Sequence, residues 1–396
     1  MNCEPGRAGA QARLDVLDGF AADASPAPGV SGTPDVPVAS DVPVWSCNEW
    51  DPLEEVIVGR LEGATIPSDH VTVTFNLPPL TARLYRLAAG RKYPKWMVRL
   101  AQKELDGFIH ILEAEGVRVR RPDVVDFSRR YRTPGWSSRG FCAACPRDGF
   151  LVIADEIIET PMCWPSRYFE GDAYRSLFKD YFAKGARWSA APRPQLCEAL
   201  FDRDYRPPGP GEPLRYVVTE FEPVFDAADF VRCGRDLFAT RSNVTNRMGI
   251  EWLRRHLGEG FRIHEIESRC RTPMHIDSSF MPLAPGKALV NPDYVDVEKL
   301  PPILRHWDLL VAPRPDPVDG VMSRISMCSP WTSINVLMLD EERVIVDKSQ
   351  TALIKALADW GFRPISCPFL SYGPFGGSFH CATLDVRRRG PLRSYF

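Results

Sequence analysis

The chain has 396 residues, with 49 lysines and arginines against 51 aspartates and glutamates, and its formal net charge is −2. A charge so nearly balanced argues against bulk electrostatic binding to nucleic acid or to acidic membranes. No apolar run approaches the ~20 residues that cross a bilayer, and residues 1–10 do not form a secretory signal, so we expect a cytoplasmic protein.

The first segment, residues 1–43, differs in composition from the rest of the chain. It holds six prolines and one aromatic residue, Phe20. Such a segment cannot bury enough apolar area to offset the entropy lost on ordering it. We therefore predict a disordered N-terminal extension over residues 1–43. From Val44 onward the aromatic and β-branched content stays high without a later linker, which predicts a single catalytic domain over residues 44–396.

A weak internal repeat runs along that domain. A helix predicted over Trp96–Glu115 is followed by Gly116, an apolar residue, an arginine and a short strand. The same order recurs at Gly185, at Gly260 and, after a helix predicted over Gln350–Trp360, at Gly361. Glycine suits the left-handed position that closes a helix. A fifth unit, over residues 300–312, keeps the order of helix and strand but lacks the glycine.

Further strands are predicted between these junctions, at Glu55–Gly59, Leu151–Ile158, Leu237–Thr240, Ala288–Val290, Asn335–Leu339 and Arg343–Val346. Each unit is therefore expected to have the order β-β-α-β. Five such units predict a closed, pseudo-symmetric ring of α/β modules whose loops meet at a site on the axis. The alternative is a two-domain α/β protein with chance similarity at the junctions.

The 11 cysteines are an odd number scattered over the whole chain, which favours reduced intracellular thiols over a disulfide framework. Cys142 and Cys145 form a lone Cys-x-x-Cys pair. A zinc site would need a second ligand pair at comparable spacing, and the sequence has none. We therefore predict two buried small residues here and no metal.

Two short segments combine residues with catalytic chemistry. His275 stands two residues before Asp277, so both side chains share one face if the segment is a strand. Cys381 follows His380 and lies shortly after Gly376-Gly377, a pair that permits close approach of backbone and substrate. Taken singly, a histidine on a strand is more often structural, and a cysteine is more often buried and inert.

Carboxylates add to these two segments. Asp226 lies among small and apolar residues, and Asp148 stands just before a strongly apolar strand. An aspartate at a strand edge often only caps a turn. A pocket with several carboxylates and one thiol would suit a guanidinium, which is planar, cationic and matched by carboxylates. Because a guanidinium carbon is a poor electrophile, a thiolate is a better nucleophile for it than a hydroxyl.

Four runs of this sequence are specific enough to identify a family. They are Asn48–Gly59, Glu222–Asp229, Met274–Asp277 and Gly376–Arg388, of which the first and last are long. In these runs the chain resembles the arginine amidinotransferases, which include glycine amidinotransferase and inosamine-phosphate amidinotransferase. The resemblance covers nearly all of residues 44–396. It implies the pentein fold, a five-fold pseudosymmetric α/β propeller of ββαβ modules, in agreement with the repeat.

The resemblance also implies residue roles. Cys381 would be the nucleophile, His275 the general acid and base, and Asp226 the carboxylate partner of His275. Asp148 and Asp277 match family positions that grip the guanidinium or the donor amino acid. The family implies no metal and no organic cofactor.

Other substrate-contacting positions depart in part from the family. Ser329 matches a serine that contacts substrate, with Cys328 in place of a neighbouring serine. Family members bind the donor carboxylate with an arginine at the position that Tyr294 occupies here. A phenol offers one hydrogen bond but no charge. Either Arg324 supplies the missing charge, or the donor is not plain arginine.

The implied reaction is a ping-pong transfer. Cys381 attacks the guanidinium carbon of L-arginine, His275 protonates the departing nitrogen, and ornithine leaves an amidino-cysteine behind. An acceptor amine then gives its proton to His275 and departs as a new guanidine. Water must be excluded, because it would hydrolyse the intermediate. The run Arg271-Thr272-Pro273 differs from the pattern of glycine-using members, so we expect an acceptor other than glycine.

Two other functions stay open on the sequence alone. A hydrolase of the arginine deiminase type would use the same nucleophile with water as the acceptor, and would form citrulline. A non-catalytic guanidine-binding protein would fit Tyr294, although intact Asp226, His275 and Cys381 argue against it. The Pro-, Ala- and Arg-rich composition suggests a high-GC bacterium and hence a natural-product pathway. The expected partners are L-arginine and an amine, with a homodimer left open.

Overall fold

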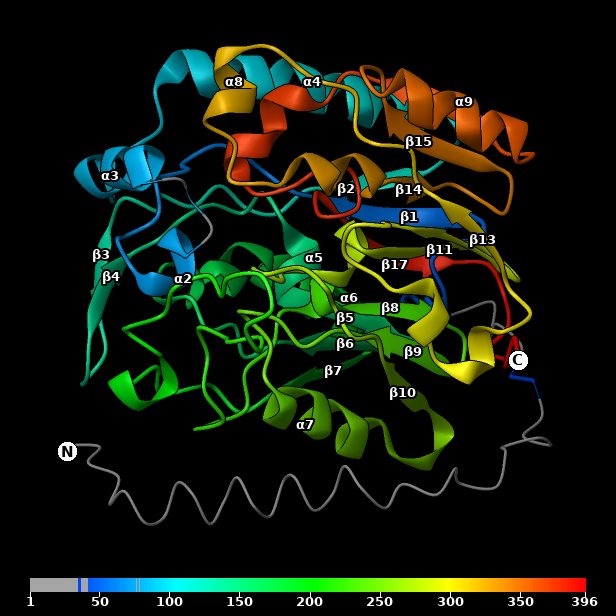
Figure 1. The fold of residues 1–396 in the computed structure, drawn as a ribbon, viewed down its shortest axis with the longest axis horizontal. Coiled ribbons are helices and arrows are strands. Elements are labelled where there is room, and N and C mark those ends of the chain that lie inside the picture. Colours follow the sequence, from blue (N-terminus) through cyan, green and yellow to red (C-terminus); the bar gives the residue numbers. More distant parts are fainter. Residues whose placement is uncertain (1–34, 37–41, 76, 78) are drawn as a thin grey trace.

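The computed structural model describes residues 35–36, 42–75, 77 and 79–396 (Figure 1). Most of the predicted N-terminal extension therefore lies outside the described residues. In the two described parts of it, Val36 pairs with Leu392 through backbone hydrogen bonds of 3.0 and 2.9 Å, and the Val42 carbonyl accepts from Arg387. Among the described residues, no helix combines the length and apolar character needed to cross a membrane.

The described strands form five three-stranded sheets and one two-stranded hairpin. In sheet order, the three-stranded sheets are β17 (Thr383–Arg388), β1 (Leu53–Val58) and β2 (Arg118–Arg120); β5 (Phe150–Ile153), β6 (Glu156–Glu159) and β7 (Arg187–Ala190); β8 (Phe230–Cys233), β9 (Asp236–Ala239) and β10 (Arg262–Glu265); β11 (Phe280–Ala284), β12 (Lys287–Val290) and β13 (Asp308–Val311); and β14 (Leu337–Met338), β15 (Arg343–Asp347) and β16 (Arg363–Cys367). The hairpin pairs β3 (Arg130–Arg132) with β4 (Ser137–Arg139).

All five three-stranded sheets share one topology. The middle strand pairs antiparallel with one neighbour and parallel with the strand that follows it after a helical connection. A parallel pair needs such a crossover, whereas an antiparallel pair needs only a tight turn. One sheet joins the two ends of the domain, because β17 near the C-terminus pairs with β1 near its start.

The longer helices are α4 (Lys95–Ala114), α7 (Arg247–Leu257), α3 (Pro79–Ala88), α6 (Arg175–Ala183) and α9 (Thr351–Asp359). Single helical turns are α2 (Val71–Thr74), α5 (Pro146–Gly149) and α8 (Val321–Arg324), and the 3₁₀ helices are η1 (Pro165–Arg167), η2 (Glu170–Tyr174), η3 (Glu198–Leu200), η4 (Ala227–Asp229), η5 (Gly258–Gly260), η6 (Ile276–Ser278), η7 (Val297–Lys299), η8 (Pro302–Leu304), η9 (Pro330–Ile334) and η10 (Leu370–Phe375). In Figure 1, α4 and α9 lie along one side of the strands and α7 along the opposite side.

Most of the predicted repeat is confirmed. The helices predicted over 96–115 and 350–360 are α4 and α9, and a strand follows each of the four predicted glycines. Gly116, Gly185 and Gly361 have φ angles of 84°, 103° and 99°, in the left-handed region. In the third unit the left-handed conformation belongs to Gly258, with a φ of 65°, and not to Gly260, although β10 follows Gly260 as predicted. The helix predicted in the fifth unit is only the turn η8.

One strand prediction is wrong, and five strands were not predicted. The single strand predicted over 151–158 is a hairpin of β5 and β6, which turns at Ala154 with a φ of 52°. The strands missing from the prediction are β3, β4, β8, β11 and β17. The residues of β8 and β11 are almost fully buried on both faces, so these two strands lack the alternation of polar and apolar residues that marks a half-buried strand.

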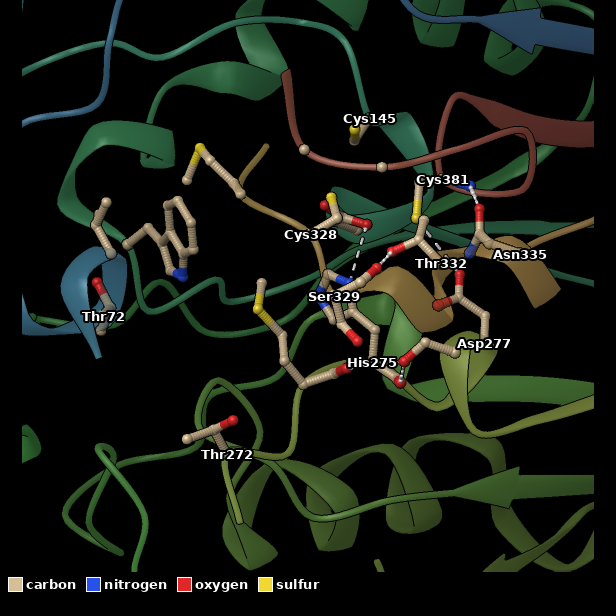
Figure 2. A pocket seen from close by; sticks show the side chains of 18 of the residues that line it. Thr72, Cys145, Thr272, His275, Asp277, Cys328, Ser329, Thr332, Asn335 and Cys381 are labelled. Carbon is tan, nitrogen blue, oxygen red and sulfur yellow. Dashed lines mark hydrogen bonds and ion pairs between the residues drawn. The ribbon is translucent and has the colours of Figure 1, made fainter. Parts of the chain in front are cut away.

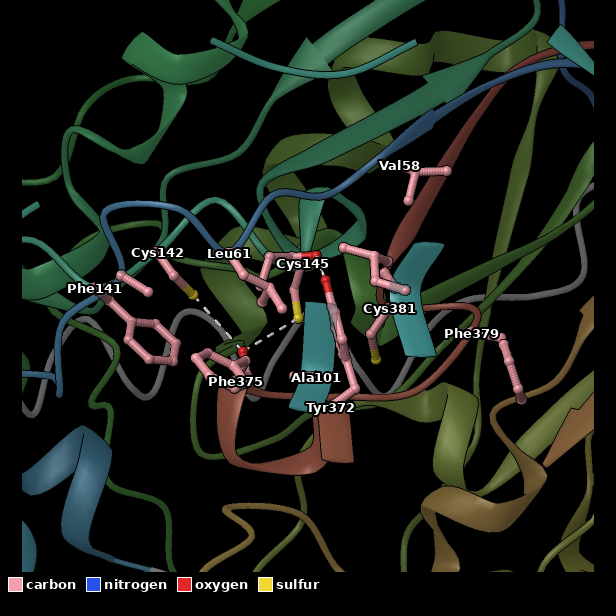
Figure 3. Packing of buried hydrophobic residues seen from close by; sticks show 14 of the residues in the cluster. Val58, Leu61, Ala101, Phe141, Cys142, Cys145, Tyr372, Phe375, Phe379 and Cys381 are labelled. Carbon is pink, nitrogen blue, oxygen red and sulfur yellow. Dashed lines mark hydrogen bonds between the residues drawn. The ribbon is translucent and has the colours of Figure 1, made fainter. Parts of the chain in front are cut away.

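The largest apolar cluster supports the segment that leads to Cys381 (Figure 3). Helix α4 buries its apolar face there, and the ring of Phe108 packs 5.2 Å from that of Phe379. The Cys142 and Cys145 thiols are both buried and donate to the Phe375 carbonyl, at 3.7 and 3.6 Å. The prediction of two buried small residues is therefore confirmed.

Candidate active site

The sequence-predicted residues lie at equivalent places in different sheets. In each three-stranded sheet, the segment just before its first antiparallel strand contains them: Asp148 before β5, Asp226 before β8, His275 and Asp277 before β11, Ser329 before β14, and Cys381 before β17. Asn335, which was not predicted as a site residue, also lies before β14. Because the sheets share one topology, these segments meet on one side of the molecule. They surround a cavity of about 90 Å³ (Figure 2), which we call the catalytic cavity after the role predicted for its residues.

His275 lies between two carboxylates. Its Nε2 is 3.1 Å from Asp226 Oδ2, and its Nδ1 is 3.8 Å from Asp148 Oδ1. Burial alone would lower the pKa of the imidazole, but Asp148 and Asp226 outweigh it and raise that pKa to about 10. The backbone of His275 has a φ of 59°, a strained conformation for a residue with a side chain. The ring is thus held in place and holds a proton at neutral pH.

The Cys381 thiol also faces carboxylates. Its Sγ is 3.6 Å from Asp277 Oδ2, and its backbone N–H donates to Asn335 Oδ1 at 3.1 Å. Burial, together with Asp277 and Asp148, raises the pKa of the thiol well above its usual range. One ligand atom each from Asp148, His275 and Cys381 lies within 4.8 Å of the others. A bound cation would offset the carboxylates and favour the thiolate.

Arg167 holds Asp148 in place, and Glu170 in turn holds Arg167; neither buried residue was predicted from the sequence. Arg167 donates to Asp148 Oδ2 at 2.6 Å and to both oxygens of Glu170 at 2.7 Å. Asp148 Oδ1 has no hydrogen-bond partner among the described residues. We call Asp148, Arg167, Glu170, Asp226 and His275 the acidic cluster, since three carboxylates face two bases. Charged residues such as Arg167 usually lie at the surface, so no sequence signal marked it.

A second set of buried ions lies next to the segment that carries Cys381. We call Glu49, Arg147, Arg232, Asp385 and Arg388 the arginine cluster. Arg232 donates to Glu49 at 2.8 and 2.7 Å and to Asp385 at 2.6 Å, and Arg388 donates to Asp385 at 2.6 Å. Arg147 forms ion pairs with Glu49 and Asp385.

His380 connects this arginine cluster to the cavity. Its Nδ1 is 2.8 Å from Asp277 Oδ2, and its Nε2 is 3.2 Å from Glu49 Oε2. The hydrogen bond from His380 helps to lower the pKa of Asp277 against the effect of burial. Asp277 is therefore held as an anion beside the thiol.

The backbone before Cys381 lies too close to the nucleophile to carry another side chain. A Cβ on Gly377 would lie 2.3 Å from Cys381 Cβ and 2.8 Å from Cys381 Sγ. This close approach is the reason for glycine in the run that precedes the cysteine.

The remaining sequence-predicted residues are divided between two cavities. Tyr294 and Cys328 line the catalytic cavity with Ser329, and the Tyr294 hydroxyl is 2.9 Å from Ser329 Oγ. Burial raises the pKa of Tyr294 to about 12, so the phenol is neutral. Arg324 is not brought to this group, because it is exposed on α8 and lines a neighbouring cavity.

The arrangement suits a planar cation that reacts with a thiol. Carboxylates line the cavity on both sides of Cys381, and Asp148 keeps one oxygen free to accept. Asp148, His275 and Cys381 are also residue types that could together hold a metal ion. Because the pKa of His275 is about 10, its imidazole is protonated at neutral pH. A protonated imidazole competes with metal binding, since a histidine must lose that proton to become a ligand.

Comparisons with known proteins agree with this chemistry. No protein-family model matches the chain. It is 49% identical over 353 residues to the L-arginine:L-lysine amidinotransferase of Pseudomonas savastanoi pv. phaseolicola, which covers 89% of this chain and 96% of that relative. It is also 45% identical over 377 residues to the mitochondrial glycine amidinotransferase of Danio rerio, covering 91% of this chain and 86% of that relative.

Solved structures extend the comparison. SxtG, an amidinotransferase from Microseira wollei in the saxitoxin biosynthetic pathway, superposes with a TM-score of 0.86 at 58% identity, covering 89% of this chain and 100% of SxtG. DDAH from Pseudomonas aeruginosa, solved with citrulline, gives a TM-score of 0.52 at 13% identity over 84% of this chain and 99% of DDAH. The second likeness concerns the fold alone, and it agrees with the α/β pentein fold that the sequence predicts.

Proposed function

The chain belongs to the arginine amidinotransferases, and from that premise we propose that it moves the amidino group of L-arginine to an acceptor amine through Cys381. One observation carries the proposed mechanism. The reactive atoms of Asp148, His275 and Cys381 lie within 4.8 Å of one another, with Asp226 on the far nitrogen of the imidazole. A nucleophile, an acid and a base partner are thus in mutual reach.

Donor binding uses the excess of carboxylates. The guanidinium of arginine lies between Asp148 and Asp277, where the free Oδ1 of Asp148 accepts a hydrogen bond. The donor carboxylate accepts from the hydroxyls of Tyr294 and Ser329, because the described lining of the cavity offers it no uncommitted arginine or lysine. The bound cation also lowers the pKa of the Cys381 thiol.

In the first half-reaction the thiolate of Cys381 forms a bond to the guanidinium carbon. His275 starts protonated, since its pKa is about 10, and its proton goes to the departing nitrogen. The thiol has released its proton to solvent on binding of the cationic donor, so the C–N bond breaks and ornithine leaves with a neutral side-chain amine. The amidino group stays on sulfur as a cation between Asp148 and Asp277.

In the second half-reaction an amine takes the place of ornithine. His275, now neutral, accepts the proton of the amine as its nitrogen attacks the amidino carbon, and the C–S bond breaks. Asp226 stabilises the imidazolium that forms, from 3.1 Å. A cavity of only about 90 Å³ limits the water that can reach the intermediate.

The overall organisation belongs to the same proposal. The shared topology of the five three-stranded sheets supports a five-fold pseudosymmetric propeller of ββαβ modules. We place the catalytic domain at residues 44–396 and an extension at 1–43, in a cytoplasmic enzyme that works in natural-product biosynthesis and leaves a homodimer as an option. The relative in saxitoxin biosynthesis supports the choice of pathway.

The proposal is tested with arginine labelled with ¹³C in the guanidinium group, incubated with a mixture of primary amines. We expect ornithine and a labelled guanidine in equal amounts, and intact-mass measurement should find one amidino group on Cys381. Labelled citrulline in place of the new guanidine would support the hydrolase alternative. Arginine binding without any product would support the non-catalytic alternative.

A further inference from the structure

A second cavity adjoins the catalytic one. It has a volume of about 480 Å³, against about 90 Å³ for the catalytic cavity. Cys328, Ser329, Thr332 and Gly377 line both. A volume of several hundred Å³ is typical of a cavity that holds a small organic molecule, so the larger cavity has room for a second ligand beside the donor in the smaller one.

The two cavities meet beside the nucleophile. Gly377 belongs to both, and a Cβ at that residue would lie 2.8 Å from Cys381 Sγ. No side chain of Gly377 therefore separates the second cavity from the thiol. A molecule whose tail occupies the second cavity could place its head group next to an amidino group on Cys381.

The charged groups of the second cavity differ in what they already bind. Asp316 accepts from Thr351 and from the backbone of Ala352 at 3.0 and 2.9 Å, at the start of α9. Asp347 accepts from Ser349 and from the backbone of Phe369. These two carboxylates are thus committed to holding loops and a helix end in place.

Other polar groups that line the second cavity, a guanidinium and two hydroxyls, have no side-chain partner among the described residues. The guanidinium of Arg324 is exposed and makes no hydrogen bond or ion pair with another described residue, and the hydroxyls of Ser333 and Ser378 make none either. A guanidinium with flanking hydroxyls binds a carboxylate well, because the fork of Arg offers two parallel donors.

On these grounds we propose that the second cavity binds the tail of the acceptor, and that the acceptor is a primary amine whose tail ends in a carboxylate read by Arg324. This inference rests on the proposed amidino transfer and adds the substrate class of its second half-reaction. It also gives Arg324 a role apart from the donor, whose carboxylate lies at Tyr294 and Ser329.

Two assays separate the cavities. Exchange of labelled ornithine into arginine needs only the donor site, because ornithine is both product and acceptor. The second assay compares amidino transfer to 4-aminobutanoate and 6-aminohexanoate with transfer to butylamine and hexylamine. The difference in kcat/KM measures how much a carboxylate at the far end of the acceptor contributes to recognition. We expect wild type to prefer each amino acid over its matched amine by about tenfold or more in kcat/KM.

Variants of the second cavity should change transfer far more than exchange. Arg324→Gln should reduce the preference for the amino acids to less than about twofold. Ser333→Trp should fill the cavity and lower transfer to 6-aminohexanoate by about tenfold. Arg305→Gln, at another exposed arginine, is the matched control. Melting temperatures check that each variant is folded.

Three results would overturn the inference. One is a wild-type enzyme that exchanges ornithine but shows no preference for the amino acids. Another is a preference that survives Arg324→Gln. The third is a folded Ser333→Trp variant in which exchange and transfer fall by the same factor. A wild-type enzyme without any exchange would instead contradict the proposed amidino transfer.

Discussion

The acidic cluster and the arginine cluster are both fully buried, yet their charges are balanced in opposite ways. In the arginine cluster three guanidinium groups surround Glu49 and Asp385, so each anion has more than one cation. In the acidic cluster, Asp148, Glu170 and Asp226 share Arg167 and His275, and one oxygen of Asp148 accepts no hydrogen bond.

This difference separates structural ions from functional ones. A buried ion pair without a missing partner contributes to holding the fold, and removing one member is costly. A buried cluster short of positive charge destabilises the free protein and is relieved by a cationic ligand. His380 joins the two, because it bonds Asp277 on one side and Glu49 on the other. The arginine cluster thereby positions the carboxylate beside the nucleophile.

The largest expected effect is on chemistry at the edge of the acidic cluster. Cys381→Ala should lower turnover by at least about a thousandfold, because the covalent bond to the migrating group cannot form. Its melting temperature should stay close to that of wild type. Peptide mapping after reaction with arginine checks the site, and Cys197→Ala is the control that should still carry the adduct. An adduct on a different cysteine would contradict the assignment.

A substitution in the arginine cluster should mainly lower the stability of the fold, whereas Cys381→Ala should mainly lower turnover. Arg232→Met leaves Glu49 and Asp385 short of a cation in a buried place. We expect the free energy of unfolding to fall by about 3–5 kcal/mol, measured by urea denaturation at pH 7. Arg314→Met, at an exposed arginine, should have no such effect. An unchanged urea midpoint for Arg232→Met would contradict the structural role that we assign to the arginine cluster.

The pH dependence of stability tests the charge on His275. Its folded-state pKa of about 10 lies above the ordinary value of 6.5. A raised pKa contributes stability that is fully present below pH 6.5 and is lost as pH rises through about 10. The advantage of wild type over His275→Gln in urea midpoint should therefore shrink steadily over that window. An advantage that grows with pH would show that the imidazole is neutral in the folded enzyme.

A smaller effect on arginine binding is expected at Tyr294, where we propose that the catalytic cavity binds the donor carboxylate. Tyr294→Phe removes a hydroxyl that donates to the donor carboxylate, worth about 1.5–3 kcal/mol for a bond to a charged group. The KM for arginine should rise by about tenfold or more, while the KM for agmatine, which lacks that carboxylate, should change little. Tyr216→Phe serves as the control. A preference for arginine over agmatine that survives Tyr294→Phe would place the carboxylate elsewhere.

The smallest effect is expected far from both clusters. Removal of residues 1–43 loses the pairing of Val36 with Leu392 and the bond from Arg387 to Val42. Three hydrogen bonds at a chain end should lower the melting temperature by less than about 4 °C, and kcat/KM for arginine should stay within twofold. A large loss of activity would mean that this segment contributes to the catalytic cavity.

Much of the fold was predictable because its signals are local. Helices α4 and α9 follow from apolar residues on one face, and their ends follow from Gly116 and Gly361. The strands β8 and β11 were not predictable in the same way, because strands buried on both faces carry no alternation. The turn at Ala154 also carries no sequence mark, since alanine rarely adopts a positive φ.

The residues of the candidate site were predictable only where their residue type or local motif is rare in the sequence. Seven histidines and the glycine-rich run before Cys381 are few enough to single out His275 and Cys381. Arg167 and Glu170 were missed, because among 100 charged residues nothing local distinguishes the buried ones. Their burial depends on how the segments before β5 and β8 pack, which is a tertiary property.

The sequence by itself determined the family, the repeated unit and the residue types of the chemistry, because these depend on neighbours along the chain. Only the tertiary structure decided which charges act together. It placed Arg324 in the second cavity and Tyr294 in the first, although both stood as alternatives for one carboxylate. The physical reason is that electrostatic and hydrogen-bonding partners act over a few ångströms in space, whereas residues such as Asp148 and Cys381 are 233 positions apart in the chain.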